Sequence, residues 1–316
     1  MTETPTESMA SALHLSGGDI PGGPGPSYRL WRFGGNTIPV LLAVPHSGRA
    51  YPESTLASLR APDEARLRLE DRYIDAVAYP VAAANAAGLL LAQAPRAMID
   101  LNRSVDDIDW GMIKGSKPKP LRHSLANRRS RSGLGLVPRR IPGMGELWRR
   151  PLARTELDAW IAGIYQPYHT ALGGELERLR DRSGVALLID LHSMPPLKPH
   201  HPQDRPAEFV IGDRFGASCD PGLVDLALRY LANHGRRVAH NRPYSGGYVL
   251  DRYGQTVRGI HALQIEVCRS TYLDARLDQP SARLPAIVKL LAGLVRTLGA
   301  EAATMARRGP IAQAAE

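Results

Sequence analysis

Two histidines and one glutamate stand at or near the carboxyl ends of apolar runs in the sequence. His46 follows one such run directly, His192 follows a second, and Glu266 lies near the end of a third. Two imidazoles and a carboxylate with an open fourth position form a common catalytic zinc shell. In an open α/β sheet, ligands bind beyond the carboxyl ends of the strands. If the three runs are strands of one such sheet, these residues predict a metal-dependent catalytic site.

Each of these residues also has a structural interpretation. His46 could hydrogen-bond the loop that turns at Gly48, and His192 could pair with Asp190, two residues earlier on the same face of its strand. Glu266 alternates with apolar neighbours and would face solvent if its strand lay at an edge of the sheet. In a central strand it would be a buried carboxylate, which is rare unless the group is paired or functional. Because all three residues converge on one edge, we favour the functional interpretation.

The elements that would position these residues are apolar runs that alternate with helical patterns. The predicted strands are Ile38–Val44, Leu89–Ala92, Ala97–Leu101, Val185–Leu191, Phe209–Gly212 and Ile260–Val267. The predicted helices are Asp63–Ala87 with a kink near Pro80, Thr155–Arg182, Pro221–His234 and Ser281–Arg307. Strands separated by helices are typical of a doubly wound sheet. The sequence therefore predicts the α/β class, with a mostly parallel or mixed sheet flanked by helices.

The predicted organisation is one folded domain with short extensions. Residues 1–27 are polar and rich in Gly and Pro, without the apolar core of a signal peptide, which predicts a disordered leader. Residues 28–308 form the predicted domain, and residues 309–316 form a tail. The uncharged stretch 76–95 is interrupted by Pro, Asn and Gly, which favours a buried helix and strand over a membrane span. With only two cysteines, a reduced, cytoplasmic protein is the simplest interpretation.

The positive charge of the chain is concentrated in one segment. The net charge is +9, but residues 114–154 carry +11 and the remainder of the chain carries −2. Gly and Pro scattered through residues 114–150 predict an irregular excursion from the domain. Such a segment could attract nucleic acid or an anionic substrate. Base stacking uses several aromatic side chains, and this segment has only Trp148. We therefore favour a solvated loop near the mouth of the active site over a nucleic-acid-binding segment.

Five motifs occur in an order that resembles the N-formylglutamate amidohydrolase family. They are Pro45-His46-Ser47-Gly48, Arg96 with Asp100-Leu101-Asn102-Arg103, Asp190-Leu191-His192-Ser193, Gly246-Gly247-Tyr248 and Gln264-Ile265-Glu266-Val267. The resemblance covers most of the chain, between Pro39 and Asp274. It implies a carboxypeptidase-like α/β fold and a catalytic zinc ion. It also implies hydrolysis of N-formyl-L-glutamate to L-glutamate and formate, a reaction of amino-acid degradation and histidine catabolism.

The resemblance identifies His46 and His192 as metal ligands but leaves the third ligand open. In the wider superfamily a carboxylate often lies three residues after the first histidine, where this chain has Arg49. The corresponding carboxylate segment of this chain begins with Asp71 and ends with Asp75. These two aspartates are four positions apart and would share one face of the predicted helix. We expect Asp75 to be the third ligand, with Asp71 as the alternative.

The other motifs fit the recognition of a small anionic amino acid. N-formylglutamate carries two carboxylates, and arginine offers a two-pronged donor where lysine offers only a point charge. Arg96 and Arg103 are the predicted carboxylate-binding residues, and Asn102 is predicted to contact the substrate amide or the backbone. Gly246 and Gly247 would let the backbone approach the ligand closely. The structural alternative is an ion pair between one of these arginines and a neighbouring aspartate.

Glu266 is the predicted general base. It would take a proton from the attacking water and return it to the departing amine, while an arginine near the metal ion holds the developing oxyanion. Three other functions stay open: the same chemistry on another N-acyl amino acid, nucleic-acid binding through residues 114–154, and a cysteine hydrolase built on Cys268. Loss of activity on metal chelation would separate the metal-dependent enzyme from the cysteine hydrolase.

Overall fold

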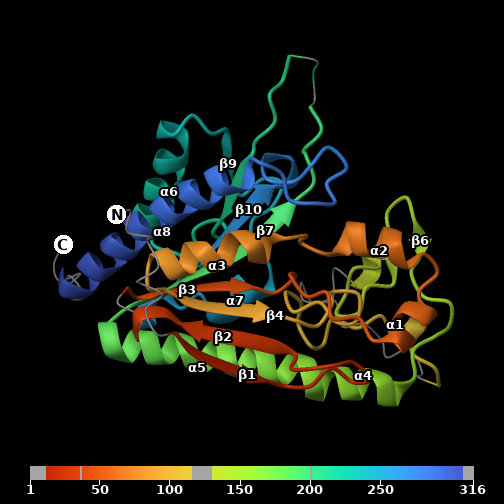
Figure 1. Cartoon of the computed structure of the whole chain (residues 1–316). Helices are drawn as coiled ribbons and strands as arrows, with labels where there is room; N and C mark the ends of the chain where they lie inside the picture. The colour runs from red at the N-terminus through yellow and green to blue at the C-terminus, as the bar shows by residue number, and fades with distance from the viewer. Residues whose placement is uncertain (1–11, 36–37, 116–129, 200, 202, 309–316) are drawn as a thin grey trace, which may run out of the picture.

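A mixed eight-stranded sheet forms the centre of the computed structural model, which describes residues 12–35, 38–115, 130–199, 201 and 203–308. The strands follow the order β1-β2-β4-β3-β7-β10-β8-β9 (Figure 1). Their bounds, in that order, are Leu13–Gly17, Tyr28–Arg32, Gly88–Ala92, Val40–Val44, Ala186–Met194, Ile260–Cys268, Phe209–Gly212 and Val238–His240. β4, β3, β7 and β10 are parallel neighbours, whereas the pairs β1–β2, β2–β4 and β8–β10 are antiparallel. The predicted α/β class with a mixed sheet is confirmed.

The central strands bring the predicted site residues to one edge of the sheet. β7 and β10 are buried along their whole length, as expected of parallel strands that are covered on both faces. Their register places His192 of β7 beside Glu266 of β10. On the other side of β7 lies β3, and His46 follows its carboxyl end. The parallel arrangement that the sequence predicted is therefore what assembles these three residues.

Helices cover both faces of the sheet. α3 (Ile74–Ala84), α6 (Pro221–Asn233) and α8 (Leu284–Arg308) pack on one face, and α5 (Gln166–Ser183) and α7 (Tyr248–Tyr253) pack on the other (Figure 1). α5 continues α4 (Arg154–Trp160) through a π-helical turn, η5 (Ile161–Tyr165). The remaining helices and strands are α1 (Glu53–Ser58), α2 (Pro62–Leu69), β5 (Arg140–Ile141) and β6 (Gly145–Glu146). Short 3-10 turns are η1 (Phe33–Gly35), η2 (Trp110–Met112), η4 (Ser130–Ser132), η6 (Thr256–Arg258) and η7 (Arg269–Thr271).

Among the described helices, none is both long enough and apolar enough to cross a membrane. The apolar residues of α3 and α8 instead lie in the same core cluster. Val77 and Val81, one helical turn apart on α3, share this cluster with Leu294 and Leu298 of α8. The uncharged stretch around α3 is therefore a buried helix followed by a buried strand, β4, as the sequence predicted.

The prediction of a disordered leader over residues 1–27 is wrong from residue 12 onward. β1 pairs antiparallel with β2, and Ile20 is fully buried in the core. This strand has no recognisable apolar pattern because β1 lies at the edge of the sheet and exposes even its apolar side chains, with Leu13 51% exposed. Residues 1–11 and the predicted tail lie outside the described residues.

The long helix predicted over Asp63–Ala87 is two helices. α2 ends at Leu69 and α3 begins at Ile74, with Tyr73 in the left-handed region at a φ of 54°. This conformation is uncommon for a residue other than glycine, and it interrupts the helical backbone between α2 and α3. Pro80 lies inside α3 and does not end it. One smaller prediction also fails, because residues 97–101 form turns and irregular backbone instead of a strand.

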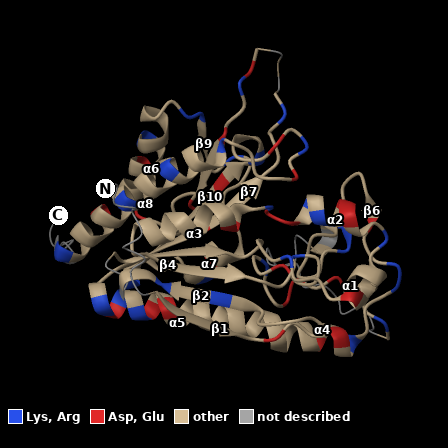
Figure 2. Cartoon of the chain, in the orientation of Figure 1, with Lys and Arg blue, Asp and Glu red and all other residues tan. Residues whose placement is uncertain are grey.

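The basic segment is described only in part, because residues 116–129 lie outside the described residues. Where it is described, four of its arginines form ion pairs: Arg139 with Asp109 and Glu146, Arg140 with Glu146, Arg150 with Glu156, and Arg154 with Asp158. Figure 2 shows acidic and basic positions together on α4. Trp148 is buried, and its Nε1 donates to the Pro138 carbonyl. These pairings favour a structural role for the described part of this segment.

Candidate active site

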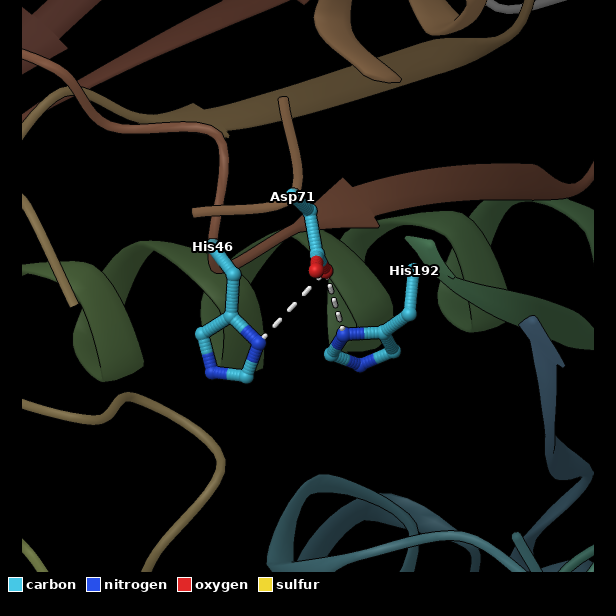
Figure 3. Close-up of side chains that lie close together, drawn as sticks. All are labelled: His46, Asp71 and His192. Atoms are coloured by element: carbon cyan, nitrogen blue, oxygen red, sulfur yellow. Dashed lines mark hydrogen bonds and ion pairs between the residues drawn. The ribbon is translucent and has the colours of Figure 1, made fainter. Parts of the chain in front are cut away.

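Three buried side chains from distant parts of the chain meet at the carboxyl edge of the central strands. His46 follows β3, His192 lies on β7, and Asp71 lies in the break between α2 and α3. One potential ligand atom from each residue lies within 4.8 Å of the other two. Figure 3 shows both imidazole rings directed toward the Asp71 carboxylate. The cluster has the composition of a His–carboxylate–His metal site.

The inner nitrogen of each ring faces the same oxygen of Asp71. His192 Nδ1 lies 3.1 Å from Asp71 Oδ2, and His46 Nδ1 lies 3.6 Å from it (Figure 3). The second separation is too long for a hydrogen bond. His46 Nδ1 is buried and, among the described residues, has no hydrogen-bond partner. A buried nitrogen of this kind is costly unless something binds it, and a metal ion between the three groups would do so.

The outer nitrogen of each ring is held by a buried carboxylate. His46 Nε2 lies 2.7 Å from Asp100 Oδ1, and His192 Nε2 lies 2.9 Å from Asp190 Oδ2. When such a ring is neutral and keeps its proton on Nε2, beside this carboxylate, its Nδ1 lone pair points toward the centre of the cluster. Metal-binding histidines are almost always oriented in this way by a second group. The residues present therefore fit a divalent metal ion.

The charges of the cluster are strongly coupled. Burial opposes a charged His192, but Asp190 and Asp71 outweigh it and raise the pKa of His192 well above its ordinary value. Burial likewise opposes an ionised Asp71, but the two imidazoles lower the pKa of Asp71 far below its usual range. Without a metal ion, these shifts favour an ionised Asp71 beside a positively charged His192. A bound cation would take the place of the additional proton on His192.

Glu266 lies next to this cluster without belonging to it. It is buried on β10, and Gln264 Nε2 donates a 2.9 Å hydrogen bond to its Oε1. Burial raises the pKa of Glu266 to about 7, with Asp71 acting in the same direction and His192 and Arg96 acting against it. A carboxyl group that titrates near neutrality can both accept and return a proton under physiological conditions. Its geometry and its charge suit a general base.

Arg96 lies close enough to both Asp71 and Glu266 for its charge to act on them. Its Nε donates to Asp100 Oδ2 at 2.8 Å, which completes a chain from the guanidinium through Asp100 to His46. Burial opposes the charge on Asp100, but Arg96 and its neighbours hold the pKa of Asp100 well below its usual range. The Arg96 side chain is 20% exposed. The ion pair between an arginine and a neighbouring aspartate, which the sequence left open as a structural alternative, is therefore present. The two terminal nitrogens of Arg96 form no hydrogen bond with the described residues.

Arg103 and Asn102 are bonded mainly within the protein. Arg103 Nε donates to the Leu134 carbonyl at 2.9 Å, and its Nη1 donates to the Asn102 carbonyl at 2.7 Å. The Asn102 side chain accepts from the backbone N–H of Val249 at 2.9 Å, and its Nδ2 lies 3.3 Å from His192 Nε2. The structure thus places Asn102 beside His192 and the start of α7, whereas Arg103 also lies 3.9 Å from Asp100 Oδ2. Substrate contact by either residue stays a prediction.

Gly246 and Gly247 allow close packing at this point. A Cβ on Gly247 would lie only 2.5 Å from Asn102 Oδ1. Gly246 has a φ of 101°, which strongly favours glycine, and a Cβ there would meet Leu250. The two glycines therefore let the start of α7 close over Asn102. The sequence predicted a close approach to a ligand; the neighbour that the structure shows is the Asn102 side chain, and ligand contact by either glycine stays a prediction.

The expectation that Asp75, and not Asp71, joins the two histidines is corrected by the structure. Asp75 lies in the first turn of α3 and forms a two-pronged ion pair with Arg49, at 2.9 and 2.7 Å. Asp71 joins the cluster because the helix is broken before it, and its backbone N–H donates to the His46 carbonyl at 2.9 Å. The assumption of one continuous helix, with both aspartates on one face, was the source of the error.

Sequence reasoning also missed Arg269, which follows β10. Its buried guanidinium lies 3.4 Å from Asp71 Oδ1 and donates to the Ser193 hydroxyl at 3.0 Å. An arginine three residues after Glu266, just beyond an apolar run, is the signal that could have identified it. Cys268, the nucleophile of the alternative hydrolase, is buried beside Met194 and Val210, and its Sγ lies 3.1 Å from Ser270 Oγ. That environment contains no imidazole among the described contacts of the thiol.

Proteins of similar sequence cover most of the chain. Residues 38–273 match the model of the FGase family, N-formylglutamate amidohydrolase. An N-formylglutamate deformylase of Pseudomonas aeruginosa is 32% identical over 267 residues, which cover 82% of this chain and 93% of that protein. An N-formylglutamate deformylase of Pseudomonas putida is 31% identical over 241 residues, which cover 75% of this chain and 82% of that protein.

Two solved structures share the fold. The crystal structure of N-formylglutamate amidohydrolase from Ralstonia eutropha JMP134 has a TM-score of 0.76 and 33% identity, and the match covers 90% of this chain and 99% of that one. A gene product of Agrobacterium tumefaciens has a TM-score of 0.63 at 19% identity, with 90% and 97% of the two chains covered. The second likeness extends to the fold alone.

Proposed function

Since the chain belongs to the N-formylglutamate amidohydrolase family, we propose that it hydrolyses N-formyl-L-glutamate to L-glutamate and formate with a zinc ion held by His46, Asp71 and His192. One observation carries the metal site. Both Nδ1 atoms face a single carboxylate oxygen, while each Nε2 is held by a carboxylate of its own. A His–carboxylate–His set with an open position is a typical catalytic zinc shell, although other divalent ions share these ligands.

The residues around the site divide the chemistry among them. When bound, the metal ion would polarise the formyl carbonyl and make water a better nucleophile near neutral pH. Glu266 would take a proton from the attacking water as its oxygen bonds to the formyl carbon. It would return that proton to the amine nitrogen as the carbon–nitrogen bond breaks. The products are then formate and the free amino acid, and Glu266 is ready for another cycle.

Arg96 supplies the charge recognition in this proposal. The substrate is a dianion, and the oxygen of the formyl group becomes negative during the attack. Because Arg96 bonds Asp100 through Nε, its two terminal nitrogens can donate to a substrate carboxylate or to the developing oxyanion. Asp100 holds this fork in place and also orients His46. Substrate recognition and metal binding therefore share one buried carboxylate.

The experiment that tests this function measures formate release together with metal content. N-formyl-L-glutamate, N-formyl-L-glutamine and N-acetyl-L-glutamate would be compared on one preparation, with and without a chelator. We expect the first substrate to have the highest kcat/KM, and we expect chelation to stop turnover until zinc is restored. Equal kcat/KM values for N-formyl-L-glutamine, whose side chain is neutral, and N-formyl-L-glutamate would refute the proposed substrate. Turnover that persists in the presence of the chelator would refute the dependence on a metal ion.

The cellular setting follows from the proposed substrate and from the two cysteines. Both thiols are buried and unpaired, as expected in a reducing compartment, which supports a cytoplasmic enzyme. Release of glutamate and formate would place the enzyme in histidine catabolism. Accumulation of N-formylglutamate in cells that lack the gene would test that assignment.

A further inference from the structure

Arg269 connects three elements at the edge of the active site. It stands at the end of β10, and its side chain is buried. Its Nε donates to Ser193 Oγ at 3.0 Å, at the end of β7. Its Nη1 donates to the Leu67 carbonyl at 2.8 Å, and its Nη2 donates to the Glu70 carbonyl, both at the end of α2. One guanidinium thus joins two strands of the sheet to the segment that carries Asp71.

The contacts of Arg269 explain why α2 ends where it does. If the helix continued, the Leu67 carbonyl would accept from the N–H of Asp71. That N–H donates instead to the His46 carbonyl, and Arg269 takes the carbonyl that is left. The last carbonyls of a helix need such outside partners. By donating to the Leu67 carbonyl, Arg269 stabilises the end of α2. Asp71 is then free of the helix and lies beside the histidines.

The two oxygens of the Asp71 carboxylate have different partners, and Arg269 contacts only one of them. Oδ2 faces both imidazoles, at 3.1 and 3.6 Å, whereas Oδ1 lies 3.4 Å from Arg269 Nη2. We propose that Arg269 is a positioning residue that holds Asp71 so that it offers a single oxygen to the metal ion. This role rests on the proposed metal site. It would set how tightly the ion binds and how many oxygens surround it.

The neighbouring Arg72 provides a matched control. It belongs to the same loop, and its described ion pairs are with Glu70, at 3.0 Å, and with Asp278. Its carbonyl accepts from the Tyr272 hydroxyl at 2.8 Å, which helps to dock the loop. Arg72→Gln would thus remove a partly buried guanidinium from this loop and leave the Arg269–Asp71 contact in place. Loss of stability and loss of metal binding can be separated by comparing the two positions.

The test uses the full-length protein, stripped of metal and reloaded. Zinc affinity would be measured by competition with a chromophoric chelator, coordination by the visible spectrum of the cobalt form, and stability by thermal unfolding without metal. Arg269→Gln should weaken zinc binding by about ten- to a hundredfold, the usual effect of losing a group that orients a metal ligand. Its cobalt spectrum should change as the second Asp71 oxygen becomes available. Arg72→Gln should lower stability but keep the zinc affinity and the cobalt spectrum of the wild type.

Arg269→Lys keeps the charge and provides a second variant if Arg269→Gln does not fold. An ammonium lacks the planar fork that serves Leu67, Glu70 and Ser193 together, so its zinc affinity should also fall. Unchanged zinc affinity and cobalt spectrum in a folded Arg269 variant would overturn the proposal and leave a purely structural residue. An equal loss in Arg72→Gln would overturn it too. A wild-type protein that binds no zinc or cobalt would instead refute the proposed metal site, and the role of Arg269 with it.

Discussion

Glu266 of β10 and His192 of β7 occupy paired positions on neighbouring parallel strands. Paired positions in a sheet project their side chains to the same face, so this pair is aligned by backbone hydrogen bonds and not by a flexible loop. His192 reaches Asp71 through Nδ1, whereas Glu266 is held by Gln264. The proposed proton acceptor is therefore fixed beside the proposed metal ligand while its carboxylate stays outside the cluster.

His192→Ala should lose zinc and activity together, because it removes one of two nitrogen ligands. A matched control is His169→Ala, since His169 is also buried but bonds Tyr253, away from the cluster. The control should cost about 1–3 kcal/mol of stability, as is common for buried groups, and retain its zinc. Zinc content and circular dichroism would be measured on both proteins. A His192→Ala protein with one zinc per chain would refute the ligand assignment.

Asp71→Ala should abolish zinc binding, whereas Asp75→Ala should leave it intact. Asp75 forms an ion pair with Arg49 in which both side chains are partly exposed, so its loss should cost only about 0–1 kcal/mol. Asp71 offers Oδ2 to both histidines, and nothing else in the described cluster replaces that oxygen. Chelator competition on the two variants would rank them. The opposite ranking would restore Asp75 as the ligand.

Glu266→Gln should keep zinc and substrate binding but lower kcat by about a hundred- to ten-thousandfold, the usual contribution of a positioned acid–base group. The sign of the pH effect follows from the base, which acts only when deprotonated. Because burial raises the pKa of Glu266 to about 7, wild-type kcat/KM should fall as the pH drops through that region. A bound cation would move this limb to lower pH. The variant should lack the limb, and near-normal turnover would remove Glu266 from the mechanism.

Zinc affinity should rise as the pH increases above about 6.5, because zinc competes with the proton on His192. Asp190 and Asp71 overcome the effect of burial and raise the pKa of His192 well above its ordinary value of 6.5. In the metal-stripped protein, that protonation contributes stability that is complete below pH 6.5 and is lost as the pH rises through the folded pKa. Titrations at several pH values would measure both trends. A pH-independent zinc affinity would show that His192 is neutral before the metal binds.

Arg96→Lys should raise KM for N-formylglutamate more than Arg103→Lys does. Arg96 bonds Asp100 through Nε, whereas Arg103 donates to two backbone carbonyls. Each charged hydrogen bond lost to the substrate is worth about 1.5–3 kcal/mol, or roughly ten- to a hundredfold in KM. Steady-state kinetics on both variants, with zinc content as the control, would decide. A larger effect at Arg103 would assign the substrate carboxylate to Arg103 instead of Arg96.

Much of the fold could be predicted because its signals are local. β3, β7 and β10 are apolar runs, and α6 and α8 have clear helical patterns with proline near their starts. β1 could not be predicted because an edge strand needs little apolar burial, and its partner lies on β2. The break after α2 could not be predicted either, since the sequence has no proline or glycine between Leu69 and Ile74, where the helix is interrupted.

The sequence by itself determined the α/β class and the positions of His46, His192 and Glu266, because apolar runs and the residues at their ends are properties of short segments. Only the tertiary structure decided that Asp71 replaces Asp75. That choice depends on where α2 ends, and the Leu67 carbonyl at its end is bonded by Arg269, 202 positions later in the chain. The tertiary structure likewise decided the position of Asn102, which packs against Gly247, a residue far from it in sequence. Hydrogen-bond partners at such distances leave no periodic pattern, so only the folded chain shows which buried donor satisfies which carbonyl.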